Sequence, residues 1–135
     1  MPVIATEPKR LSDLVKEELW ASSGYCRKVV TVDSGSAFTL SFGECLGKIS
    51  ATGVYIPAVD TAVDGSATIA AIYIGTVDGT FGVDAEISAD GTDVIALVQG
   101  PAIVGADALV YDSSFTAAEV EADLAALNIV VGDQL

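Results

Sequence analysis

The feature that most constrains the fold is an apolar run, TIAAIYIG at residues 68–75, which follows a loop of small and acidic residues ending in Asp64-Gly65. The run is too short for a typical helix, and its Ile and Tyr residues favour a strand. An apolar run without polar alternation is typical of a strand that is covered on both faces. The sequence therefore predicts a β-rich domain with a buried strand at residues 68–75.

Several other short apolar runs, separated by turn residues, indicate the same class of fold. Gly43, Thr52-Gly53 and Gly100-Pro101 should interrupt the strands, because glycine accepts positive φ and proline cannot donate to a ladder. The segment ADGT lies between two of the runs and predicts a hairpin. Strand regions are predicted at residues 26–33, 38–50, 51–57, 68–75, 83–88, 93–99 and 108–112.

A helix is predicted in FTAAEVEADLAALN, near the C-terminal end. Thr116 is the expected N-cap, and Glu119 lies three residues later, which is the spacing of a capping box. Phe115 and Val120 have the spacing of a hydrophobic staple. Asn128 can end the helix in the left-handed conformation, after which IVVG predicts a terminal strand.

The N-terminal segment differs from the rest of the chain. MPVIATEPKR has two prolines and no periodicity, which predicts an extended arm, and LSDLVKEELW at residues 11–20 has the apolar spacing of a short amphipathic helix. Short helices are marginally stable alone, so this one needs a partner surface on its own body or on another chain. ASSG then acts as a hinge. We expect an arm at residues 1–24 and a body at residues 25–135.

Charges are unevenly distributed along the chain. The sequence has 19 acidic and 6 basic residues, a formal net charge of −13, and all six basic residues lie in the first 48 positions. Six of the acids lie there too, so residues 49–135 hold thirteen acids and no base. Such a body repels nucleic acid and anionic membranes. No run approaches the roughly 20 uncharged apolar residues of a membrane-spanning helix. Neither nucleic acid nor a membrane is an expected partner.

The Asp-Gly pairs raise the question of a metal site. They occur at Asp64-Gly65, Asp78-Gly79 and Asp90-Gly91. A calcium loop needs alternating oxygen ligands and a later Glu, a spacing that none of the three has, although Asp60 with Asp64 comes closest. The simpler interpretation is turn residues that tolerate positive φ, with calcium binding as the alternative. We expect no metal and no cofactor.

Groups for catalysis are scarce. The chain has no histidine, so a nucleophile would need a lysine or a carboxylate as its base. Ser34, Ser36 and Ser41 are near Lys48 only in sequence. No phosphate-loop or dinucleotide motif follows any predicted strand, and the aromatic residues are not interleaved with basic ones. No catalytic residue is predicted.

The two cysteines, Cys26 and Cys45, lack the spacing and the histidines of a standard zinc site. We expect two reduced, partly buried thiols in a cytosolic product, with a disulfide between them as the alternative pairing. A lowered pKa of Cys26, caused by Arg27 and Lys28, is the alternative.

Two stretches are specific in their order and spacing. In LGKISATGVYIP followed by DGSATIAAIYI, a Gly-Lys-Ile turn and an Asp-Gly-Ser loop precede an Ala- and Ile-rich strand, and ALVYD precedes an Ala-rich helix and a final NIVV strand. Together with EPKRLSDLVKEEL and CRKVVTV before them, they resemble the head decoration proteins of lambda-like tailed bacteriophages and their prophage relatives. The resemblance covers nearly the whole chain.

This resemblance implies a structural virion protein. It implies a capsid cement protein without catalytic residues, bound as homotrimers at three-fold and quasi-three-fold positions on the outer surface of the expanded head, where it resists internal DNA pressure. The implied partners are the major capsid protein and further copies of this chain. In the family, the N-terminal arm reaches onto neighbouring capsid proteins and can add a strand to one of their loops. The residues in the corresponding position are Pro2, Val3, Ile4, Pro8, Lys9, Arg10, Leu11, Leu14, Val15, Leu19 and Trp20.

The expected fold class is mostly β with one short C-terminal helix (α+β, a small β-barrel or tulip-like body), plus an extended N-terminal arm carrying a short helix. The Gly- and Ala-rich loops 58–67 and 100–108 are the expected trimer seam. The residues expected in this seam are Val59, Val63, Pro101 and Ile103.

Because the N-terminus lacks a signal-peptide pattern, we expect synthesis in the bacterial cytoplasm before assembly into the virion.

Two other functions compete with this one. A host- or glycan-contacting β module on the virion surface would show clustered exposed aromatics near Asp or Asn, whereas Tyr55, Tyr73 and Tyr111 are spread along the chain. A small Ser or Cys hydrolase would need a base, which the sequence does not offer.

Overall fold

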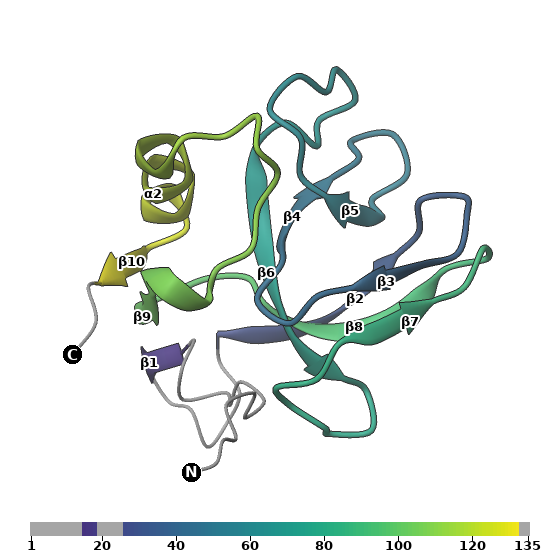
Figure 1. Ribbon diagram of the computed structural model, residues 1–135, viewed down its shortest axis with the longest axis horizontal. Coiled ribbons are helices and arrows are strands. Elements are labelled where there is room, and N and C mark those ends of the chain that lie inside the picture. Colours follow the sequence, from purple (N-terminus) through teal and green to yellow (C-terminus); the bar gives the residue numbers. More distant parts are fainter. Residues whose placement is uncertain (1–14, 19–25, 133–135) are drawn as a thin grey trace, which may run out of the picture.

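The computed structural model describes residues 15–18 and 26–132, except for the side chains of residues 16–18 and 107 (Figure 1). Within these ranges the chain is mostly β with one short α-helix near the C-terminal end, which confirms this part of the predicted class. The elements are β1 (Val15–Glu18), β2 (Arg27–Val32), β3 (Phe38–Leu40), β4 (Cys45–Lys48), β5 (Tyr55–Pro57), β6 (Ile69–Thr76), β7 (Ala85–Ile87), β8 (Thr92–Leu97), β9 (Ala102–Gly105), the 3-10 helix η2 (Ala106–Ala108), α2 (Ala117–Ala126) and β10 (Ile129–Gly132).

The predicted buried strand is β6, which supplies several of the core residues. It pairs antiparallel with β4 on one side and with β8 on the other. Ile69 and the five residues Ala71–Gly75 are buried. Helix α2 packs beside β6 (Figure 1). Both faces of the strand are therefore covered, which explains why its sequence shows no polar alternation.

Five strands surround this core in the pairing order β2-β5-β4-β6-β8, and β8 pairs back onto β2. All six residues of β2 pair with β8. In contrast, β2 meets β5 at a single parallel pair, Val32 with Tyr55. A hydrogen bond of 3.0 Å from the Asp33 N–H to the Tyr55 carbonyl extends this contact. The ring of strands is therefore weakest between β2 and β5.

A second sheet has the order β1-β9-β10, with β9 in the middle. β10 runs parallel to β9, and β1 runs antiparallel to it. In Figure 1 this sheet lies to one side of the ring, with α2 above it. The segment that begins the described chain thus shares a sheet with the segment that ends it.

Helix α2 has the capping box that the sequence predicts. The Thr116 Oγ1 accepts a hydrogen bond of 3.2 Å from the Glu119 N–H, and the Glu119 carboxylate accepts one of 2.8 Å from the Thr116 N–H. Val120 and Leu124 are buried against the body. Asn128 has φ of 65°, which confirms the left-handed residue at the helix end.

The predicted N-terminal helix is wrong over the residues that can be compared. Val15–Glu18 form the strand β1, and the rest of the predicted helix, residues 11–14 and 19–20, lies outside the described residues. The pairing of β1 with β9 has a bulge between Val15 and Glu17. Helical spacing is a weak preference in a short segment, and the main-chain hydrogen bonds that β9 provides outweigh it.

Two further predictions need correction. The turn between residues 88 and 91 forms, with a hydrogen bond of 3.0 Å from the Gly91 N–H to the Ser88 carbonyl. However, β7 pairs with β3, whereas β8 pairs with β2 and β6, so the two strands do not make a hairpin ladder. The predicted strand at residues 108–112 is reduced to one bridge, Val110 with Glu44, after the 3-10 helix η2.

Candidate functional site

The two cysteine thiols are buried and unpaired with each other. Burial, followed by the charges of Glu44 and Asp123, raises the pKa of Cys45 to about 12. The Cys26 Sγ donates to the Pro101 carbonyl at 3.7 Å, in a position with no exposure to solvent. Both thiols are therefore buried and pack as small apolar groups.

The serine alternative with Lys48 as its base does not form at Ser34. The Ser34 hydroxyl donates to the Ser36 carbonyl at 3.0 Å in an exposed turn. Lys48 lines a different opening, with Lys28 and Tyr55. In the part of the chain that the structure describes, no group of three or more His, Cys, Asp or Glu residues is placed to hold a metal ion. No helix within the described ranges is long and apolar enough to cross a membrane.

Asp64-Gly65 is a turn held by side-chain hydrogen bonds. The Asp64 carboxylate accepts bonds from the Ser66 hydroxyl at 2.5 Å and from the Ser66 N–H at 3.0 Å, and these bonds lower the pKa of Asp64. Gly65 has φ of 104°, and a Cβ there would lie 2.2 Å from the Ser50 Oγ. This is the geometry of a turn, as the simpler interpretation of Asp-Gly predicts, and the turn leads the chain into β6.

Of the predicted arm residues, only Val15 lies among the described residues. Val15 is half-buried, packs against the core and pairs with Val104 of β9. The remaining arm residues, from Pro2 to Leu14 and at Leu19 and Trp20, stay predictions. The strand β1 is nevertheless informative, because it lies at the edge of its sheet, beside β9.

The four predicted seam residues differ in exposure. Val63 is fully exposed and Pro101 is exposed, whereas Val59 and Ile103 are half-buried. Ile103 lies in the central strand β9. The loop between β5 and β6 and the strand β9 lie at separate ends of the molecule (Figure 1). The four residues therefore do not form one continuous patch.

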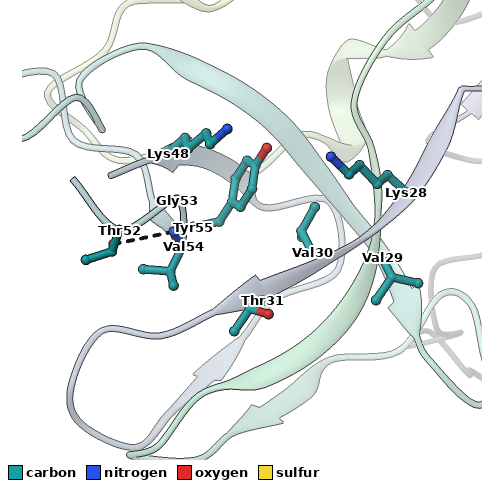
Figure 2. A pocket seen from close by; sticks show the side chains of 9 residues that line it. All are labelled: Lys28, Val29, Val30, Thr31, Lys48, Thr52, Gly53, Val54 and Tyr55. Atoms are coloured by element: carbon teal, nitrogen blue, oxygen red, sulfur yellow. Dashed lines mark hydrogen bonds between the residues drawn. The ribbon is translucent and has the colours of Figure 1, made fainter. Parts of the chain in front are cut away.

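An opening that the sequence did not indicate lies where β2 and β5 separate. Its volume is about 300 Å³, and its walls carry Lys28 from β2, Lys48 from β4 and Tyr55 from β5. Figure 2 shows Lys28 and Lys48 on opposite walls, with the Tyr55 ring between them. Burial raises the pKa of Tyr55, so its hydroxyl is neutral at pH 7. Lys28 and Lys48 are far apart in the sequence, and only the strand pairing brings them together.

The described residues thus contain buried thiols, acidic turns and a two-lysine opening, and they lack the constellation of a catalytic site. A model of the family described as bacteriophage lambda head decoration protein D matches residues 4–131. The chain belongs to this family. Among curated proteins, none matches the sequence significantly.

Family membership gives the broad function. Head decoration proteins are structural rather than enzymatic, and they belong to the phage capsid. The match begins at residue 4, so it includes most of the predicted arm as well as the body. The aromatic residues agree with a structural role, since Tyr55 and Tyr73 are buried. These two buried side chains cannot contribute to the exposed aromatic cluster that a glycan-contacting module would need.

Proposed function

We propose that the protein is a capsid cement protein that binds the outer surface of the expanded phage head as homotrimers at three-fold and quasi-three-fold positions. The observation that carries the proposal is the family match, which spans residues 4–131. The acidic body suits an outward face, because it repels nucleic acid and other virions. The proposed partner is the major capsid protein.

The N-terminal arm is the proposed contact with the capsid protein. Its root, β1, is an edge strand of the body, so the residues before it start from a fixed point on the protein. An extended arm that adds a strand to a capsid loop gains main-chain hydrogen bonds without a deep pocket. Three arms on one trimer bind as a unit, so modest contacts add up to strong overall binding.

Stabilisation of the head follows from linkage. A ligand that binds only the expanded shell lowers the free energy of that shell relative to every other state. A trimer that contacts several capsid subunits opposes their separation when packed DNA presses outward. This role requires no chemistry from the body, only a rigid base for the arms.

Binding to expanded empty heads tests the proposal. The wild-type protein should cosediment with the heads to saturation. A variant lacking residues 1–14 keeps β1 and should retain the folded body but lose most of its binding. A variant lacking residues 1–18 also loses β1. If only this second variant has a lower melting temperature, then the weaker binding of the first variant comes from the missing arm residues and not from a less stable body.

Two results would count against the proposal. Equal binding of the wild-type protein and the variant lacking residues 1–14 would remove the arm from the mechanism. Absence of saturable binding by the wild-type protein would overturn the cement function itself.

A further inference from the structure

The opening between β2 and β5 has an unusual charge environment. Lys28 and Lys48 are exposed on a body that is otherwise acidic, and neither ammonium group has an ion pair or hydrogen bond with any described group. The Tyr55 hydroxyl likewise bonds no described partner, and it lies between the two lysines in Figure 2. Three hydrogen-bond donors thus line one opening, and the Thr31 hydroxyl on its β2 wall is already bonded to the Asp93 carboxylate at 2.6 Å. A carboxylate from outside the molecule would complement them.

The walls of the opening are partly apolar. Val30 is buried and projects toward Tyr55, and Val29 beside it is an exposed large apolar side chain. β2 and β5 share only one pair, so no ladder closes the space between them. The opening offers a mostly polar surface between two cations, which fits a loop that presents a carboxylate.

The same chain carries a loop with that chemistry. In the loop between β5 and β6, Val63 is fully exposed and lies between Asp60 and Asp64 in the sequence. The loop is held in place, because the Asp60 N–H donates to the Ser114 Oγ at 2.9 Å and Asp64 is bonded to Ser66. The Asp60 carboxylate bonds no described group, so it is available for an outside partner.

We infer that the opening between β2 and β5 receives the loop 59–64 of a second copy of this chain, with Asp60 facing Lys28 and Lys48. The inference rests on the proposed trimer and names one of its contacts. Each copy carries one opening and one loop, and a head-to-tail contact of this kind closes into a ring under three-fold symmetry. The second copy is favoured over other acidic partners because its body, residues 49–135, has thirteen acids and no base.

Zero-length cross-linking on the capsid tests the contact directly. Unlabelled and nitrogen-15-labelled protein are mixed, bound to expanded empty heads and treated with a carbodiimide, which joins lysine to carboxylate without a spacer. We expect peptides of mixed isotope that join Lys28 or Lys48 to Asp60. Cross-links that join these lysines only to the capsid protein, or only to the same copy, would overturn the inference.

Charge exchange provides the second test. K48E and D60K should each weaken binding to heads, roughly ten-fold or more, because each places like charges in the contact. The double variant K48E/D60K restores opposite charges and should recover most of the binding. The double variant K48E/E121K is the matched control: it has the same net charge, but its reversed acid lies on the exposed face of α2, so binding should stay weak.

The outcomes separate the inference from the function on which it rests. If the wild-type protein fails to bind heads, the cement function falls and the contact falls with it. If the wild-type protein binds while K48E and D60K bind equally well, only the contact is wrong. Equal recovery by K48E/D60K and K48E/E121K would also overturn it, because the effect would then reflect net charge alone.

Discussion

At the residue scale, Glu44 is a carboxyl group whose surroundings disfavour its charged form. It is half-buried in the turn before β4, where its carbonyl accepts a 2.9 Å hydrogen bond from the Tyr73 N–H. Burial, partly offset by a hydrogen bond with Ser41 and reinforced by the charges of Asp112 and Asp84, raises the pKa of Glu44 to about 7. Its ordinary value is 4.5. The native protein therefore holds a proton on Glu44 that the unfolded chain has already released near pH 6.

Glu44→Gln should therefore change how stability depends on pH. The stabilising contribution of the protonated Glu44 is fully present below about pH 4.5 and is lost as the pH rises through about 7. The free energy of unfolding of the variant, relative to wild type, should rise over this window and level off above it. Urea denaturation at a series of pH values measures this, with Glu121→Gln on the exposed face of α2 as the control. A difference that stays flat from pH 4 to pH 8 would contradict the shifted pKa.

The Asp-Gly turns give a second prediction at this scale. Gly65 and Gly79 have positive φ, 104° and 89°, but a Cβ at Gly65 meets Ser50 whereas a Cβ at Gly79 meets nothing within 4 Å. Gly79→Ala should cost about 1 kcal/mol of unfolding free energy from backbone strain alone. Gly65→Ala should cost about 1–3 kcal/mol more, because the new methyl group is overpacked. Equal losses in urea denaturation would argue against the close approach at Gly65.

Turn residues of this kind could be predicted from the sequence, because Asp-Gly reports a local backbone requirement. The environment of Glu44 could not be predicted. Its raised pKa depends first on burial and then on the charges of Asp112 and Asp84, which belong to segments far along the chain. The same applies to the opening formed by Lys28, Lys48 and Tyr55, since no local pattern connects them.

At the element scale, α2 is the clearest case of a locally encoded structure. Its capping box and its left-handed end lie within a short stretch, so the sequence was sufficient to predict them. The strand β6 was predictable for a related reason: burial on both faces leaves a continuous apolar run. Partner choice is different, because β7 pairs with β3 and β1 with β9 through contacts that no local pattern records.

Removal of the cap tests the contribution of α2. Thr116→Ala deletes the hydroxyl that accepts from the Glu119 N–H, and it should cost about 1 kcal/mol of unfolding free energy. Ser113→Ala, at an exposed position just before the helix, is the control and should have little effect. Thermal or urea denaturation measures both variants. A Thr116→Ala protein as stable as wild type would show that packing of Val120 and Leu124, rather than the cap, holds the helix in place.

At the scale of the whole molecule, we propose that the function lies in contacts with other proteins rather than in a catalytic site of the body. The body is a β-rich unit with buried thiols, acidic turns and a covered central strand, and its basic residues lie among the first 48 positions. The contacts that we propose to matter are made by the arm that precedes β1 and by the loop and opening that face neighbouring copies.

Electron cryomicroscopy of expanded empty heads, incubated with the protein and compared with untreated heads, tests the central claim most directly. The account predicts added density on the outer surface at the three-fold and quasi-three-fold positions, with three copies of the β-rich body around each axis. Density at other positions, on the inner surface or as single copies, or its absence under saturating protein, would contradict the account.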